Sequence, residues 1–448
     1  MKQFTVPVHG APIMQNGEPV EIAFTPKPKQ YLWKESGDTW TVRDQKDTML
    51  HLRFHGLDSA RAKGETVSDV EKALVHIHTH NRINLALPLG GHLGGTMEWG
   101  GRTILVTEGC SPTKAKIGNW KNLHKWMVHL LGGERQLAHH LGWWQWARKS
   151  IFRTNQPPLP GHIPIYIGKS GTGKSFLQKI TSQLLGGRQG RPFAYMTGQT
   201  SFNADLFESD HLAIDDDFSN SAGNARREFG AKLKELSVAG QQWYHGKFVQ
   251  AMTLRPKWRV SISMNDEREY RNVLPPMDPS ILEKVMLFRC ADAPWFPVDL
   301  KDDNNWDEWD QMIADELPGL AWTIDNHTIP EDLQLPRYGV KPWHDPELLK
   351  EEAEESEEVV FLGCLQHDLP TVMEPGVQFW EGTSLDLERL LTGNEMPSSV
   401  RMRKLCSWSK AVGTYLGRLA RRYPTAITRR RISGKTKWRI DVEDLVRI

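Results

Sequence analysis

The chain is poor in cysteine and contains no long apolar run. No C-x-x-C pair occurs and the cysteines lie far apart, which argues against a zinc ribbon or a disulfide framework. The four cysteines are Cys110, Cys290, Cys364 and Cys406. We expect them to be buried thiols in a reducing compartment. No apolar run approaches a membrane-spanning length, and the polar start MKQFTVPVHG is not a secretory signal. These features predict a cytoplasmic protein.

An excess of charge of one sign is also missing. Lys and Arg number 56 against 55 Asp and Glu, a formal net charge of +1, so the chain as a whole is not a basic nucleic-acid-coating protein. Apolar residues make up 39% and charged residues 25%, the composition of an ordinary globular protein. The 448 residues are enough for about two to four domains, each with its own core.

The amino-terminal third contains three closely spaced histidines. His76, His78 and His80 stand in the run V-H-I-H-T-H. On a strand this spacing places all three on one face, where they would suit a metal. A polar, half-exposed strand face opposite Val75 and Ile77 is the interpretation we favour.

The same region lacks the residues expected for nicking or priming. The histidine–apolar–histidine unit resembles the metal motif of rolling-circle nickases, but these enzymes need a tyrosine downstream. No tyrosine occurs between Tyr31 and Tyr166. A primase would hold its metals with closely spaced carboxylates on a strand. Only Asp69 and Glu71 come near that spacing in the first 150 residues, and Ser68 before them is typical of a helix cap.

Residues 120–153 have a helical pattern. Apolar residues recur at three- and four-residue intervals on both sides of Gly132-Gly133, which predicts two amphipathic helices. The second helix carries Trp143, Trp144 and Trp146. These rings could form a base-stacking platform. Packing against the domain that follows is the interpretation we favour.

A phosphate-loop pattern follows a short apolar run. Ile163–Ser175 reads I-P-I-Y-I-G-K-S-G-T-G-K-S, which predicts a buried strand, a glycine-rich loop and a helix. The loop N–H groups and the helix N-terminus supply positive potential for a polyphosphate. We predict that Lys174 reaches the β- and γ-phosphates of ATP and that Ser175 ligates Mg²⁺. The predicted ATP-binding residues are Gly168, Lys169, Ser170, Gly171, Thr172, Gly173, Lys174 and Ser175.

Two later segments supply the other groups that a nucleotide motor needs. His211–Asp217 is an apolar run ending in three carboxylates, of which Asp215 is predicted to hold Mg²⁺ through water and Asp216 to polarise the attacking water. The assignment could also slide by one residue, since Asp217 follows. Residues 193–198 and 257–265 read as two further strands, and Asn265 ends the second in the position of a sensor for the γ-phosphate.

Residues 241–254 read as a hairpin between these segments. His245, Gly246 and Lys247 form its tip. A basic tip can enter a central channel and contact a phosphate backbone, and a plain surface hairpin is the alternative.

The series G-K-S-G-T-G-K-S, A-I-D-D-D, the hairpin with Lys247 and S-I-S-M-N resembles the ordered motifs of superfamily 3 helicases. More narrowly, residues 120–448 at most resemble the helicase half of poxvirus-type primase–helicases of phages and plasmids. The resemblance implies an AAA+-like hexamer that encircles one DNA strand and moves 3′ to 5′ as it hydrolyses ATP. The family commonly places an arginine after the sensor strand to reach the neighbouring subunit, and here Lys284 stands where that residue is expected. Lysine supplies charge but no bidentate fork, and Arg268, Arg271 and Arg289 lie nearby in sequence.

The carboxy-terminal end is strongly basic. From Arg401 onward there are 14 Lys or Arg against 3 Asp or Glu. A helical stretch at 408–422 is followed by a basic hairpin at 427–440 with Ser433-Gly434 at its turn, which suggests a winged helix. The residues predicted to contact DNA through its phosphates are His245, Lys247, Arg429, Arg430, Arg431, Lys435 and Lys437.

The sequence thus predicts an α/β protein with an AAA+-like parallel sheet. The expected parts are an N-terminal α+β domain (1–118), a helical collar and linker (119–160), an ATPase motor (161–300), a helical and acidic connector (301–385) and a basic winged helix (386–448). We expect a Mg²⁺- and ATP-dependent DNA helicase of a phage, prophage or plasmid replication system. Single-stranded or forked DNA and further copies of the chain are the expected partners, and a separate primase or initiator is another candidate. The alternative is a DNA-binding initiator or defence ATPase that does not unwind DNA.

Overall fold

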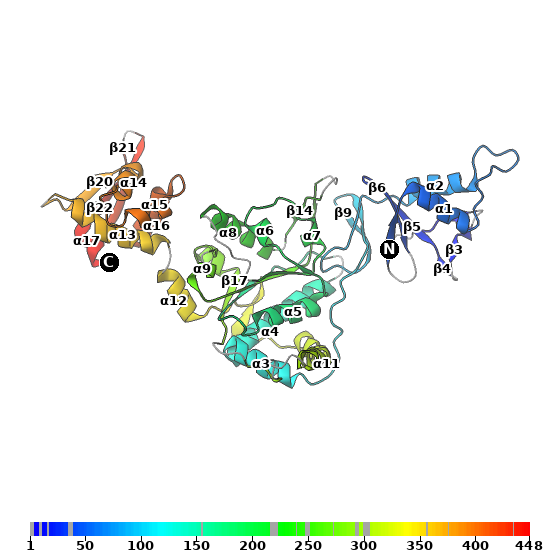
Figure 1. Ribbon diagram of the computed structural model, residues 1–448, viewed down its shortest axis with the longest axis horizontal. Helices are drawn as coiled ribbons and strands as arrows, with labels where there is room; N and C mark the ends of the chain where they lie inside the picture. The colour runs from blue at the N-terminus through cyan, green and yellow to red at the C-terminus, as the bar shows by residue number, and fades with distance from the viewer. Residues whose placement is uncertain are drawn as a thin grey trace. The chain divides into compact units, whose positions relative to one another are not determined.

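The computed structural model describes residues 4–8, 11–15, 18–34, 39–153, 156–215, 223–238, 240–246, 251–271, 273–291, 295–298, 305–354, 357–374, 376–432 and 434–448. The chain divides into two compact units (Figure 1). Unit 1 comprises Met1–Phe218, Ala231–Arg271 and Glu283–Trp343. Unit 2 comprises Ser219–Gly230, Asn272–Leu282 and His344–Ile448.

Unit 1 begins with a small antiparallel sheet backed by two helices. Strands β5 (Glu21–Pro26), β6 (Lys29–Lys34) and β7 (Trp40–Arg43) pair in that order. Helices α1 (Gln45–Phe54) and α2 (Asp69–His80) pack against them. Two short ladders precede this sheet, β1 (Pro7–Val8) with β2 (Ala11–Pro12) and β3 (Met14–Gln15) with β4 (Glu18–Pro19).

The three histidines lie on a helix, so the strand prediction for them is wrong. Ser68 caps α2 through a reciprocal capping box with Glu71, which starts the helix where the sequence suggested a cap. Helical geometry separates the histidines: His76 stacks on His80 with ring centroids 4.5 Å apart, while His78 contacts the Tyr31 hydroxyl at 2.6 Å. Among the described residues no group of three or more His, Cys, Asp or Glu side chains is arranged to hold a metal.

A second small sheet joins this region to the central sheet. Strand β10 (Arg102–Val106) lies between β8 (Leu85–Leu87) and β9 (Gly95–Trp99). The loop after β8 is bonded to the segments that flank the central strands. Gly90 donates to the Phe207 carbonyl at 2.7 Å, and Gly91 donates to the buried Asp210 carboxylate at 2.7 Å. Asp210 in turn pairs with Arg188 at 2.8 Å.

The central sheet of unit 1 is wholly parallel and has five strands. Its order is β12 (Gln189–Gly190), β13 (His211–Asp215), β16 (Arg259–Met264), β11 (Ile163–Ile167) and β17 (Val285–Arg289). Every residue of β11 and β16 is buried, as expected for central strands of a sheet covered on both faces. The predicted α/β class is therefore confirmed. The second predicted strand, at residues 193–198, is wrong, because Phe193–Met196 form the short helix α6 and β12 precedes it.

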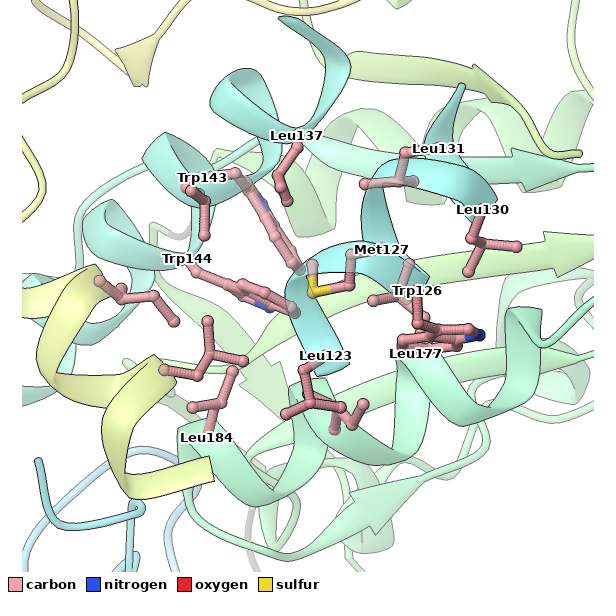
Figure 2. Packing of buried hydrophobic residues seen from close by; sticks show 14 of the residues in the cluster. Leu123, Trp126, Met127, Leu130, Leu131, Leu137, Trp143, Trp144, Leu177 and Leu184 are labelled. Atoms are coloured by element: carbon pink, nitrogen blue, oxygen red, sulfur yellow. The ribbon is translucent and has the colours of Figure 1, made fainter. Parts of the chain in front are cut away.

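Four helices cover one face of this sheet (Figure 1). They are α3 (Lys121–Leu131), α4 (Glu134–Phe152), α5 (Lys174–Leu185) and α11 (Trp306–Asp325). Gly132 ends α3 at φ +90°, a left-handed conformation that favours glycine, so the predicted break between two helices is confirmed. Figure 2 shows side chains of α3 and α4 packing against those of α5. Trp143 and Trp144 are buried in this core, which confirms packing rather than base stacking for these two rings.

The remaining elements of unit 1 are short. They are α7 (Ala204–Phe207), the antiparallel pair β14 (Gln242–Tyr244) and β15 (Met252–Leu254), α9 (Arg268–Arg271), the 3-10 turn η2 (Glu331–Leu333), and the pair β18 (Gln334–Leu335) and β19 (Gly339–Val340). Helix α8 (Gly223–Ser237) has residues in both units.

Unit 2 contains a three-stranded antiparallel sheet packed on helices. The order of the strands is β20 (Phe379–Gly382), β22 (Lys435–Asp441) and β21 (Ile427–Ile432). The helices are α10 (Pro279–Leu282), α12 (Pro346–Glu354), α13 (Glu357–Val372), α14 (Ser384–Thr392), α15 (Ser399–Leu405), α16 (Ala411–Arg422) and α17 (Val442–Arg447). Phe361 of α13 and Trp438 of β22 belong to one core, so the boundary predicted at residue 386 falls inside this packing. Among the residues described, none of the helices combines the length and apolar character that crossing a membrane requires.

Candidate active site

The phosphate loop connects β11 to α5 at the carboxyl edge of the central sheet. Gly171 and Gly173 have φ angles of +76° and +108°, which glycine adopts without strain. A Cβ on Gly168 would lie 2.8 Å from the Cβ of Cys290, so the loop begins tightly against the residue after β17. The loop bonds within itself as well, since Thr172 donates its hydroxyl to the Lys169 carbonyl at 3.1 Å. Ser170 is exposed.

The Lys174 ammonium is held inside the loop. Its Nζ donates to the carbonyls of Gly168 at 2.8 Å and Lys169 at 2.7 Å, and the side chain is 5% exposed. The same Nζ is 3.4 Å from Oδ1 of Asn265, which follows β16. Two residues predicted separately, the loop lysine and the sensor amide, thus lie together because β11 and β16 are neighbours.

Asp215, the last residue of β13, contacts the first turn of the loop helix α5. One carboxylate oxygen accepts from the Ser175 hydroxyl at 2.7 Å, and the other accepts from the Ser263 hydroxyl. A serine hydroxyl beside one carboxylate is the donor set that Mg²⁺ uses when phosphate oxygens and waters complete its shell. The residues present therefore fit Mg²⁺. Asp216, the predicted water-polarising residue, lies outside the described residues.

A buried network beneath the site holds α5 against β13 and β16, and the sequence did not reveal it. Gln178 of α5 donates to the Ile214 carbonyl and to the Ser261 hydroxyl, both at 3.0 Å. The two nitrogens of the fully buried His211 contact the hydroxyls of Ser182 at 2.8 Å and Ser261 at 2.9 Å. The one sequence feature that points to this network is that His211 begins the apolar strand that ends in Asp215.

Buried histidines predict that unit 1 loses stability as the pH falls. Burial lowers the pKa of His211 and His140 to about 3 and that of His92 to about 4. Histidine in the unfolded chain has a pKa of about 6.5. Between roughly pH 4 and 6.5 the unfolded state therefore binds more protons than the folded state, in which these histidines stay neutral. The stabilising contribution is complete above pH 6.5 and is lost below it, by about 1.4 kcal/mol per pH unit for each histidine.

Urea unfolding of the full chain between pH 7.5 and 5 measures this slope. We expect His211→Asn to reduce the slope in the acid range by close to one proton, whatever the stability of the variant at pH 7.5. An unchanged slope would show that His211 takes up its proton in the folded state.

The last residue of β17 brings an arginine to the loop edge, whereas the predicted Lys284 lies at the opposite edge. Arg289 pairs in register with Ile167 and lies 3.7 Å from the Asp266 carboxylate. Lys284 precedes β17, and its carbonyl accepts from the Ile163 N–H at the start of β11. The five residues of β17 place the backbones of Lys284 and Arg289 roughly 16 Å apart at about 3.3 Å per residue. Lys284 is therefore remote from the phosphate loop of its own chain, and its action on a neighbouring subunit stays a prediction.

The hairpin β14–β15 carries an exposed aromatic group that the sequence did not reveal. His245 follows β14, and its ring stacks on Phe202 with centroids 5.0 Å apart. Asn203 fixes this contact by accepting from the His245 N–H at 2.8 Å and donating to the Trp243 carbonyl at 2.7 Å. Phe202 and Trp243 are 45% and 64% exposed. The predicted hairpin is confirmed as a strand pair, and Lys247 lies outside the described residues.

The basic hairpin of unit 2 places its charges on both faces. Arg430 is directly opposite Lys437, and Lys435 is opposite Ile432, so these three cations share one face. Arg429 and Arg431 lie on the other face. All except the half-buried Lys437 are exposed. Three further exposed arginines that the prediction omitted, Arg418, Arg421 and Arg422, belong to α16, and the first pairs with Glu358.

Comparison with known proteins shows similarity in fold without similarity in sequence. No protein-family model and no curated protein matches the chain. The structure titled "The A form apo structure of NrS-1 C terminal region-CTR" has a TM-score of 0.54 and 14% identity, covering 94% of this chain and 96% of that chain. "The apo structure of NrS-1 C terminal region (305-718)" gives a TM-score of 0.53 at 14% identity with the same coverage. A structure titled "SCCmec type IV Cch - active helicase" matches at a TM-score of 0.33 and 10% identity over 90% of this chain and 73% of that chain, too low to support an argument. The chain has the mixed α/β fold of the NrS-1 region.

Proposed function

We propose that the protein is a Mg²⁺- and ATP-dependent DNA helicase that works as a hexameric ring in a phage, prophage or plasmid replication system. One observation carries the proposal. Lys174 and Ser175 of the phosphate loop meet Asn265 and Asp215 from the ends of β16 and β13. A lysine, a hydroxyl, a carboxylate and an amide are the groups required to bind a triphosphate and orient its hydrolysis.

Each residue at the loop has a distinct task in this proposal. Lys174 balances charge on the β- and γ-phosphates, for which its two carbonyl contacts already place the ammonium. Ser175 and Asp215 would hold Mg²⁺, which withdraws charge from the phosphate oxygens when bound. Asn265 orients the attacking water from the side of Lys174, and we assign the polarising carboxylate to Asp216.

Two surfaces support DNA as the substrate. The exposed pair of His245, which follows β14, and Phe202, which precedes α7, offers aromatic faces on which bases of a single strand can stack. In unit 2, α13, β20, α14, α15, α16 and the hairpin β21–β22 follow one another as helix, strand, three helices and hairpin. We interpret this order as a winged helix whose cations contact phosphates without reading sequence.

The basic hairpin predicts how the affinity for DNA depends on salt concentration. Replacing Arg430, Lys435 and Lys437 together by alanine removes about three phosphate contacts. We expect the slope of log affinity against log salt concentration to fall by about 2 to 3. Fluorescence anisotropy with labelled DNA between 50 and 200 mM salt measures it. The matched control replaces Lys46, Arg53 and Lys63, three exposed cations of the N-terminal region to which no DNA role is assigned. A slope that falls equally in both triple variants would contradict the assignment.

Strand separation tests the proposed function as a whole. A forked duplex with a 3′ single-stranded arm should be unwound in the presence of ATP and Mg²⁺, and a duplex with only a 5′ arm should not. A DNA-binding initiator or defence ATPase, the second candidate, would bind the fork and hydrolyse ATP while leaving the strands paired. Mass measurement with DNA and a nucleotide analogue then tests the hexamer.

A further inference from the structure

The phosphate loop is flanked by a group of aromatic rings that the proposed mechanism does not use. Phe176, the residue after Ser175, lies in the first turn of α5. Its ring centroid is 5.8 Å from that of Phe296 and 5.6 Å from that of Trp306, the first residue of α11. Phe176 and Phe296 are partly exposed, and Trp306 is 42% exposed. We call these three residues the aromatic platform.

Two fully buried tryptophans support the aromatic platform from behind. Trp309 contacts both phenylalanines, with centroids 5.4 Å from each, and Trp126 stacks on Phe296 at 6.4 Å. Trp126 and Phe296 also lie 3.1 and 3.3 Å from the position of a Cβ on Gly173. Phe176 and Phe296 therefore pack against a buried core directly beside the loop, and Trp306 contacts this pair through Phe176.

The direction in which a triphosphate would lie along the loop indicates which part of the nucleotide reaches the aromatic platform. Asp215 and Asn265 mark the γ-phosphate end, on the side of β13 and β16. The aromatic platform lies on the opposite side, where the chain continues from β17 to Phe296. A nucleotide whose terminal phosphates lie at Lys174 directs its α-phosphate, ribose and base away from Asp215. The base then comes to the aromatic platform.

We propose that the aromatic platform stacks the nucleobase of the bound triphosphate and that this contact does not select among bases. The inference rests on the proposed nucleotide site. Every base presents a π-face, so stacking on aromatic rings tolerates purines and pyrimidines alike. The substrate class is thus nucleoside triphosphates in general.

Displacement of a fluorescent ribose-labelled ATP from the full chain tests the proposal. ATP, GTP, CTP and UTP should displace it at concentrations within about tenfold of one another. Inorganic tripolyphosphate, which has no base, should require about 5 to 150 times more than ATP, since stacking contributes about 1–3 kcal/mol per base. A wild-type preference for one base by more than about a hundredfold would overturn the proposal.

Variants locate the effect. Trp306→Ala should raise the displacing concentrations of all four nucleotides by about tenfold and leave that of tripolyphosphate unchanged. Trp306→Phe should restore most of the difference between the nucleotides and tripolyphosphate. Trp295→Ala is the matched control, because this ring is 39% exposed but lies beside His129. If the ratio of the tripolyphosphate to the nucleotide displacing concentration is the same in Trp306→Ala as in the wild type, base stacking on the aromatic platform is overturned and the proposed nucleotide site still stands. A wild-type chain that binds neither the labelled ATP nor tripolyphosphate overturns the proposed nucleotide site and the aromatic platform together.

Discussion

Lys174→Ala is expected to reduce ATP hydrolysis by about two to three orders of magnitude and to abolish unwinding. The magnitude is that of removing one charged donor from a preorganised site. Lys174 is buried, and within the described part of the chain its hydrogen bonds go to the loop carbonyls and to Asn265, so we expect its removal to leave the central sheet folded. The loss should appear mainly in kcat if the ammonium acts on the charge that develops in the transition state.

Steady-state ATPase assays with and without single-stranded DNA measure this effect, and circular dichroism checks the fold. Lys179→Ala is the control, because this lysine lies on the same helix α5 and is exposed, where it pairs with Asp310 at 2.8 Å. Hydrolysis at the wild-type rate by Lys174→Ala would remove the phosphate loop from the mechanism.

Asp215→Asn is expected to cause a loss of about the same size, for a different reason. Asparagine keeps the shape and can still accept from Ser175 or Ser263, but it removes the negative charge that a hard divalent cation requires. We therefore expect the Mg²⁺ concentration at half-maximal hydrolysis to rise by at least about tenfold, in addition to the fall in kcat. Titration of ATPase activity with Mg²⁺ at fixed ATP measures both quantities.

Ser263→Ala distinguishes the charge of Asp215 from the contact that this residue makes between β13 and β16. Ser263 contacts the same carboxylate from the neighbouring strand and is fully buried. Removing its hydroxyl should lower activity far less than Asp215→Asn and leave the Mg²⁺ requirement close to that of the wild type. Equal effects of the two substitutions would indicate that Asp215 serves to join β13 to β16 and does not hold the metal.

The sequence predicted those parts of the site whose chemistry depends on short segments. The phosphate loop follows β11, the carboxylate of Asp215 ends β13 and the amide of Asn265 follows β16, and parallel pairing then brings these strand ends together. The α/β class follows from the same alternation. The helix break at Gly132 could be predicted because glycine alone readily takes the left-handed conformation found there.

Other features depended on contacts that no local pattern records. The alternation in V-H-I-H-T-H indicated a strand, but the capping box at Ser68 and the burial of Val70, Ala73, Leu74 and Ile77 on one side made a helix. Phe202 and His245 are more than forty residues apart and meet only because Asn203 bonds to the hairpin. The aromatic platform likewise gathers rings from α5, α11 and the segment after β17.

The order of the strands along the chain has a consequence for how ATP hydrolysis could drive movement. The polypeptide leaves the sheet at Asp215, passes through α8, β14 and β15, and then runs along β16 from Arg259 to Asn265. The hairpin is thus inserted in the chain between Asp215, at the carboxyl end of β13, and Arg259, at the amino end of β16. In our proposal Asp215 and Asn265 face the same triphosphate, so loss of the γ-phosphate would act first on the ends of the two strands between which the hairpin is inserted.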